Sequence, residues 1–188
     1  EKIFLKLSSH IDMDNVKEIT IEANPGESPK DRLKEYRALG VNRISFGFQS
    51  LDDNLLKFLD RLHQANDCII AYNDARDAGF ENINTDMLFN IPGQSIETLT
   101  NDLTVVAELG PEHISCYSLT VEKGTMLYND VSSGKVKMPD EKLDYDMYRT
   151  SSLVIKDAGY NHYEASNYAK ISRRCAHNLH CWSLNPYL

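Results

Sequence analysis

Three polar residues lie at the ends of three segments that are spaced along the chain like successive strands. Glu22, Gln49 and Asp86 each end a segment in which polar and apolar residues alternate. A strand buried in a parallel sheet is ordinarily apolar on both faces, whereas one face of each segment here is polar. Parallel barrels place their chemistry at the carboxyl ends of the strands. Three such residues in one phase therefore predict a polar small-molecule site at a barrel mouth, rather than three solvated loop residues.

A second group of residues that could bind a metal ion lies near the end of the chain. Cys175, His177, His180 and Cys181 are of the types that bind zinc. Structural zinc sites, however, normally take their ligands from two separated segments, and four ligands within one short segment are hard to arrange tetrahedrally. The sequence favours a loop here, with Trp182 as one buried aromatic residue, over a metal site.

One unit recurs along the chain and must position these residues: an amphipathic helix, a glycine that ends it, and an apolar strand. Glycine ends helices because it adopts the left-handed conformation without strain. The expected helix-ending residues are Gly40, Gly79, Gly110 and Gly159. The expected helix caps are Ser28, which precedes a proline, Ser95 and Asp140. The expected strands are 19–23, 43–49, 83–89, 113–119 and about 162–165.

Alternation of strands and helices predicts parallel strands joined by right-handed crossovers. A doubly wound sheet and a barrel both satisfy this pattern, and the polar strand ends favour the barrel. Arg61 lies near the end of a further helix, and a lone arginine in that position is most often a surface residue.

Composition narrows the class of protein. The chain has 188 residues, a net charge of −8 and scattered lysines and arginines, which argues against a nucleic-acid-binding surface. No segment approaches the length of a membrane span, and no signal peptide is visible. The four cysteines form no CxxC pair, which is typical of free thiols in a reducing compartment and predicts a cytoplasmic protein.

The segments EITIEANPG, GVNRISFGFQS, LDRLHQ, GFENINTDMLFNIPGQ and HNLHCW occur in a characteristic order and spacing. Together they resemble the oxygen-independent coproporphyrinogen III oxidase-like family of radical S-adenosylmethionine (SAM) proteins, over about Glu18 to Trp182. YEASNYA followed by HNLHCW is most similar to the haem-chaperone branch, whose pattern is HNxxYW. The resemblance implies an α/β fold, a partial TIM-type (β/α) barrel with about five parallel strands over 1–170. Residues 171–188 would begin a C-terminal extension.

The resemblance also implies roles for individual residues. Glu22, Gln49, Arg61 and Asp86 would line the SAM pocket, and Thr120 would lie near the adenine. Arg61 would clamp the methionine carboxylate through a charge-assisted contact. His177 would bind haem as an axial ligand. Cys181 stands where the family has an aromatic residue, which weakens the expected stacking on a porphyrin. Asn90 begins the turn Asn-Ile-Pro, at a place where the family usually has the sequence GLP.

The chain lacks the CxxxCxxC motif that holds the [4Fe–4S] cluster of radical SAM proteins. We therefore expect a truncated piece of a longer protein that binds SAM and a [4Fe–4S] cluster, with no radical chemistry and at most weak SAM binding by the piece itself. The expected partners are porphyrin or haem and a haem-recipient protein.

Several alternatives stay open. The longer protein is either an oxidase or a haem chaperone, and the chain alone could be a haem-binding module without turnover. An unrelated (β/α) hydrolase or aldolase is disfavoured, because no lysine or cysteine stands at a clear strand end with a partner. An incomplete barrel would expose the edge of the 19–23 strand, which predicts self-association through that edge.

Overall fold

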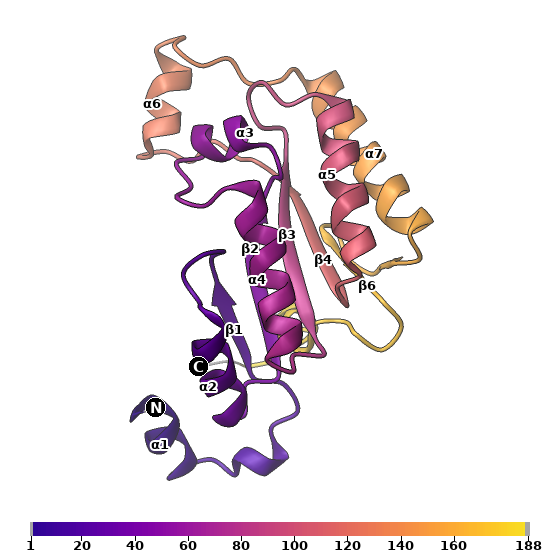
Figure 1. Ribbon diagram of the computed structural model, residues 1–188. Coiled ribbons are helices and arrows are strands. Elements are labelled where there is room, and N and C mark those ends of the chain that lie inside the picture. Colours follow the sequence, from indigo (N-terminus) through magenta and orange to yellow (C-terminus); the bar gives the residue numbers. More distant parts are fainter. Residues whose placement is uncertain (1, 187–188) are drawn as a thin grey trace.

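The computed structural model describes residues 2–186, and it shows a single curved sheet with helices along its outer face (Figure 1). The helices are α1 (Lys2–Ser8), α2 (Lys30–Ala38), α3 (Asp53–Phe58), α4 (Ala65–Asp77), α5 (Ile96–Leu109), α6 (Met126–Ser132), α7 (Glu141–Asp157) and α8 (Ala176–Trp182), with a 3-10 turn at Met13–Asn15. The strands are β1 (Thr20–Ala23), β2 (Arg43–Gln49), β3 (Ile83–Phe89), β4 (His113–Ser118), β5 (Asn161–His162) and β6 (Asn167–Ala169).

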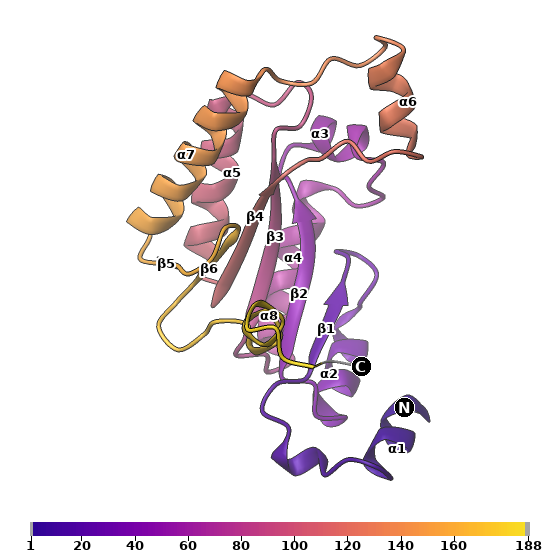
Figure 2. The ribbon, with the colours of Figure 1, turned by 180° about the vertical axis from the view of Figure 1, so that it is seen from behind.

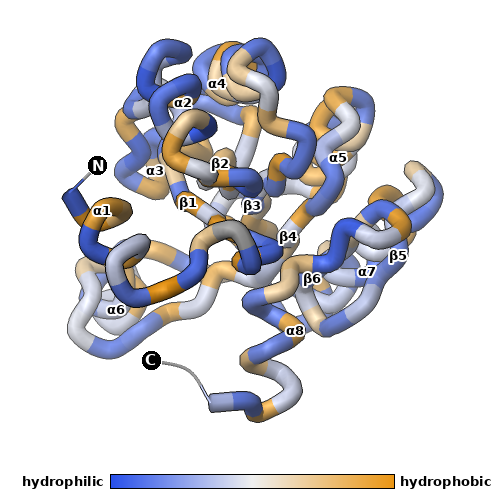
Figure 3. The backbone as a smooth tube through the Cα atoms, turned by 90° about the horizontal axis from the view of Figure 1, so that it is seen from below, coloured by the Kyte–Doolittle hydropathy of each residue, from blue (hydrophilic) through white to orange (hydrophobic). Residues whose placement is uncertain are grey.

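The sheet has the order β1-β2-β3-β4-β6-β5, and the first four strands run parallel. Helices α2, α4, α5 and α7 cover its outer face, while α8 crosses the inner face near the start of the strands (Figure 2). Seen from below, the strands form an open arc (Figure 3). The described residues thus form the parallel-stranded part of a barrel that is not closed, as the sequence indicated.

Apolar residues on the outer face of the sheet and on the covering helices form the core. On α5, Leu99, Leu103 and Val106 recur at helical spacing and are each fully buried. They pack with strand residues such as Phe46 and Met87 in one continuous cluster. The helices therefore bury the apolar face of each strand and leave the polar face turned inward.

The predicted helix ends were largely confirmed. All four predicted glycines take positive φ angles, between 76° and 96°. Ser95 and Asp140 cap α5 and α7 by accepting backbone N–H groups. Ser28 was wrong by one position, because Pro29 is the residue that precedes α2 and no side chain caps that helix.

The fifth predicted strand, at about 162–165, was wrong in extent, and its predicted parallel pairing was wrong as well. β5 and β6 form a short antiparallel hairpin, and β6, not β5, pairs with β4. A tight turn closed by Tyr163 and Asn167 joins them, and a turn this short can connect only antiparallel strands. The sheet therefore has four parallel strands followed by an antiparallel pair, instead of five parallel strands.

Candidate functional site

A cavity of about 330 Å³ lies at the carboxyl ends of the parallel strands. It brings together Glu22, Gln49, Arg61 and Asp86, although they come from four separate parts of the chain. The remaining lining residues are Ala23, Asn24, Glu27, Ser45, Gly47 and Tyr117. The sheet register explains the convergence, because Glu22 lies beside Ser45 and Gly47 lies beside Asp86 on adjacent strands.

Thr120 is not among the residues that line this cavity. β4 ends at Ser118, and the exposed Thr120 hydroxyl contacts Glu122 in the following loop. Tyr117, which lies on the same strand, lines the cavity instead. Burial raises the pKa of its phenol to about 12, so it is a neutral hydrogen-bonding group at the site.

Gln49 ends β2 in an unusual backbone conformation. Its φ angle is +68°, and the register between β2 and β3 shifts between Gly47 and Gln49. A non-glycine residue in this region is strained, and such strain is concentrated at functional sites. The side-chain Oε1 is buried and accepts no hydrogen bond from the part of the chain that the structure describes. Gln49 thus offers an unsatisfied acceptor at the cavity wall.

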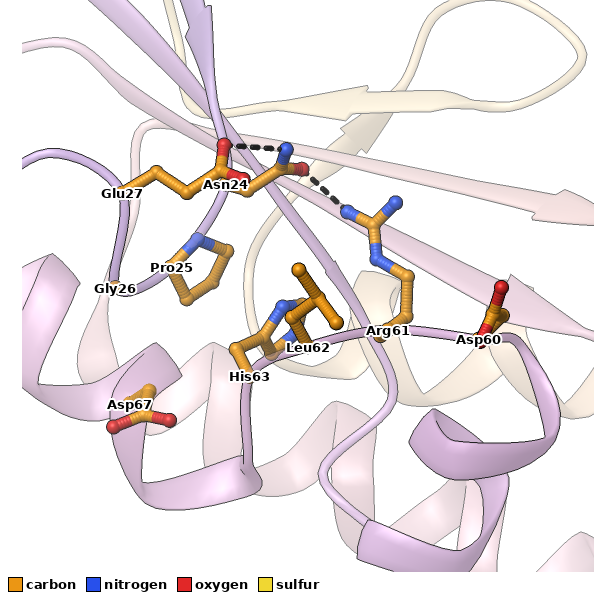
Figure 4. A pocket seen from close by; sticks show the side chains of 9 residues that line it. All are labelled: Asn24, Pro25, Gly26, Glu27, Asp60, Arg61, Leu62, His63 and Asp67. Carbon is orange, nitrogen blue, oxygen red and sulfur yellow. Dashed lines mark hydrogen bonds between the residues drawn. The ribbon is translucent and has the colours of Figure 1, made fainter.

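Arg61 reaches the cavity from the loop between α3 and α4. Its Nη2 donates to Oδ1 of Asn24 at 2.5 Å, and Asn24 in turn donates to Glu27 (Figure 4). The same Nη2 also donates to the carbonyl oxygen of Gly47 at 3.2 Å. Within residues 2–186, none of the ion pairs includes Arg61. These neutral contacts aim the guanidinium while leaving its charge available for an anionic ligand group.

A second cavity, of about 360 Å³, shares part of its lining with the first. It is lined by Asn24, Pro25, Gly26, Glu27, Asp60, Arg61, Leu62, His63 and Asp67 (Figure 4). Arg61, Asn24 and Glu27 therefore line both cavities.

Asp86 is held by donors from the same inward face. Ser45 donates to its Oδ2 at 3.1 Å, and Asn84 donates to its Oδ1 at 2.7 Å. Burial raises the pKa of the Asp86 carboxyl, and the hydrogen bonds from Asn84, Ser115 and Ser45 oppose that rise. Ser45 and Asn84 were already in phase with the predicted residues, so the alternation of the strands was the signal for them.

A chain of hydrogen bonds continues from Asp86 toward the start of the strands. Nδ1 of His113 contacts Oδ1 of Asn84 at 2.5 Å, and its Nε2 contacts the hydroxyl of Tyr163 at 2.8 Å. Burial lowers the pKa of His113 to about 3, so the ring is neutral. Because Nδ2 of Asn84 donates to Ser45 and Asp86, its Oδ1 must accept, which places the His113 proton on Nδ1. No sequence signal identified His113 or Tyr163.

Two sequence-based interpretations of the HNLHCW segment were wrong. The segment forms helix α8 rather than a loop, and Trp182 is 66% exposed rather than buried. Cys175 precedes α8 without capping it, and Glu18 caps the helix from a distance instead. The Glu18 carboxylate accepts from the backbone N–H of Ala176 at 3.1 Å and of His177 at 3.3 Å, and it contacts the Cys175 thiol at 3.6 Å.

His177 faces a different cavity from that of the strand-end residues. This cavity, of about 610 Å³, is lined by Val16, Lys17, Glu18, Thr20, Glu22, Arg43, Cys175, Ala176, His177, Asn178 and His180. Glu22 lines both cavities. Nε2 of His177, an exposed residue, lies 3.7 Å from the thiol sulfur of Cys181.

The donor set of this chain does not fit a [4Fe–4S] cluster. Cys68 and Cys116 are buried in the apolar core on α4 and β4, and burial raises the pKa of both thiols to about 12. Across residues 2–186, no three cysteine, histidine or acidic side chains are grouped to hold a metal ion. The strand-end residues, in contrast, fit SAM, because they offer a cation, two carboxylates and an unpaired amide oxygen.

No helix in the described part of the chain is long and apolar enough to cross a membrane.

The fold and this site define a (β/α)-barrel protein with a polar cavity at the strand ends. A family model described as the radical SAM superfamily matches residues 1–105. The chain belongs to the radical SAM superfamily, as the sequence indicated.

Two bacterial relatives are named heme chaperone HemW. The protein from Haemophilus influenzae is 38% identical over 183 residues, and the protein from Bacillus subtilis is 36% identical over 173 residues. These matches cover 97% and 92% of this chain but only 47% and 46% of the relatives. The chain thus spans about half the length of these relatives.

A mouse relative and a solved structure extend the comparison. The mitochondrial radical S-adenosyl methionine domain-containing protein 1 of Mus musculus is 37% identical, over 91% of this chain and 39% of that protein. The structure of coproporphyrinogen III oxidase (HemN) from Escherichia coli superposes with a TM-score of 0.78 at 24% identity, over 92% of this chain and 40% of that one. The latter likeness supports the fold.

Proposed function

We propose that this chain forms one wall of an SAM-binding pocket. The observation that carries the proposal is the convergence of Glu22, Gln49, Arg61 and Asp86 on one cavity at the strand ends. Arg61 has no acidic partner among the described residues, so it suits the methionine carboxylate. Asp86 and the free oxygen of Gln49 suit the ribose hydroxyls. Glu22 suits the positively charged end of the ligand. In this superfamily, SAM supplies radical chemistry when it is bound.

Titration of the 188-residue chain with SAM, followed by ligand-observed NMR, tests this pocket. We expect weak binding by the native chain, and a loss of about tenfold or more in Arg61→Met, since a charge-assisted hydrogen bond is removed. Lys57→Met, which removes an exposed cation from neighbouring α3, should bind as the native chain does. Equal binding by Arg61→Met and the native chain would contradict the assignment.

For the longer protein, we propose a role in haem handling, as a haem chaperone that delivers haem to a recipient protein in the cytoplasm. The support comes from the names of the bacterial relatives and from His177, which is exposed and lines the cavity of about 610 Å³. A neutral imidazole is a suitable axial ligand for haem iron.

A haemin titration that follows the Soret band tests the role of His177. His177→Ala should lose the Soret shift of a histidine-ligated haem. His180→Ala is the matched control, because the ring of His180 already contacts the carbonyl oxygen of Pro186 at 2.8 Å. Retention of the Soret shift in His177→Ala would rule this ligand out. Conversion of coproporphyrinogen III to protoporphyrinogen IX by the full-length protein would instead establish an oxidase.

A further inference from the structure

Arg43 is a buried cation on the inner face of the sheet. It begins β2 in phase with Ser45, Gly47 and Gln49, so its side chain points inward with theirs. The residue is only 4% exposed, yet it lines the cavity of about 610 Å³ that His177 also lines. The cavity lies between the start of the parallel strands and α8, which crosses the inner face there (Figure 2).

The guanidinium of Arg43 has neither an ion-pair partner nor a hydrogen-bond partner in the part of the chain that the structure describes. None of the ion pairs there includes it, and none of the side-chain hydrogen bonds comes from its guanidinium. Its Nε is buried without an acceptor. Removing a charged group from water without pairing it is unfavourable, so an arginine without an ion-pair partner at this depth points to an anion that is bound in the cavity.

The described acidic groups around Arg43 all lie beyond ion-pair distance, including Asp86, which interacts with its charge only through space. His113 and Tyr163 are occupied by their mutual hydrogen bond, and the Glu18 carboxylate is occupied by the first turn of α8. Glu22 lines the same cavity but forms no ion pair with Arg43. The terminal nitrogens of the Arg43 guanidinium therefore stay unpaired in the cavity wall, and their planar N–H donors match the two oxygens of a carboxylate.

We propose that Arg43 binds a carboxylate of the ligand that occupies the cavity lined by His177. This inference rests on the proposed haem function, in which the carboxylate is a propionate of the porphyrin. His177 and Arg43 then bind different parts of the ligand: the imidazole binds the iron, and the guanidinium binds the carboxylate. Arg43 is a ligand-binding residue in this arrangement, and it takes no part in binding SAM.

Fluorescence titration with metal-free protoporphyrin IX tests the inference separately from haem ligation, because this probe has both carboxylates and no iron. We expect the native chain to bind the diacid at least about tenfold more tightly than its dimethyl ester, the effect of losing a charge-assisted contact. Arg43→Met should bind the diacid as weakly as the native chain binds the ester. Arg43→Lys keeps the charge without the planar donor set and should lie between them.

Thermal unfolding without ligand separates a binding role from a structural one. Replacement of an unpaired buried charge by methionine should leave the melting temperature unchanged or raise it, whereas loss of a structural ion pair would lower it. Equal affinity of the native chain and Arg43→Met for the diacid, or no binding of the diacid by either, overturns the inference. Loss of the haemin Soret shift in His177→Ala tests the proposed function alone, and its outcome does not alter the diacid comparison.

Discussion

Nη2 of Arg61 lies 3.2 Å from the carbonyl oxygen of Gly47, and a Cβ atom added at Gly47 would come within 2.9 Å of that same nitrogen. The added atom would also come within 3.0 Å of the Gln49 amide nitrogen. Gly47 has no positive φ angle, so its lack of a side chain, and not its backbone freedom, is what the site uses.

Gly47→Ala should therefore displace Arg61 and weaken SAM binding by about tenfold, as if one charge-assisted hydrogen bond were lost. The measurement is an SAM titration of the single variants and of the Gly47→Ala, Arg61→Met double variant. In the absence of the guanidinium, the added methyl group should cost no further affinity, so the two effects should not add. Fully additive losses would show that the alanine acts on the site by another route.

Glu18→Ala should loosen α8 while the sheet stays folded. The carboxylate satisfies two backbone N–H groups of the first turn of α8 and places a negative charge at the start of that helix. Loss of such a cap costs about 1 kcal/mol, which corresponds to roughly fivefold faster local opening. Hydrogen exchange of residues 175–182 measures the change, and the exposed Glu35 on α2 is the matched control as Glu35→Ala. Unchanged exchange in α8 would contradict the role of Glu18.

His113 should make the free energy of unfolding depend on pH under acidic conditions. Its pKa is about 3 in the folded chain and 6.5 at its ordinary value, so between these values the unfolded chain binds a proton that the folded chain does not. Stability should therefore rise with pH across this window, by up to roughly 5 kcal/mol from this group.

His113→Asn should remove that part of the slope in urea unfolding measured between pH 3 and pH 7. The raised pKa of Asp86 acts in the opposite direction, because the folded chain then holds the proton more tightly. The contribution of His113 is therefore obtained as the difference in pH slope between the His113→Asn variant and the native chain. A similar slope in His113→Asn and the native chain would contradict a buried, neutral ring.

β1 should mediate self-association, since β2 is its one neighbour in the sheet formed by residues 2–186. The carbonyl of Ile19 accepts from Arg43 on β2, so in a parallel ladder the N–H of Thr20 points away from the sheet. Thr20→Pro removes this outward donor and should reduce association without disturbing the β1–β2 pairing. Sedimentation velocity over a range of concentrations measures it. A native chain that remains monomeric at high concentration would refute the prediction.

The sequence alone determined the repeating unit and the polar residues that belong to it. Helix ends at glycine and alternation along β2 and β3 are local properties, so the predicted strand bounds 43–49 and 83–89 are those of the structure. Glu22, Gln49 and Asp86 followed from the same alternation, because residues in one phase of a strand share one face. The resemblance added Arg61, whose position in a loop carried no local signal.

Only the tertiary structure decided which separate segments meet. The pairing of β6 with β4, the capping of α8 by Glu18 and the contact of His113 with Asn84 each join residues that are far apart in the chain or face each other only after a turn. Burial is likewise a property of the folded chain, which is why Trp182 proved exposed and Arg43 proved buried. Residue type and spacing thus determined which groups could bind a ligand, and the packing of the sheet against α8 decided which of them were left without a partner.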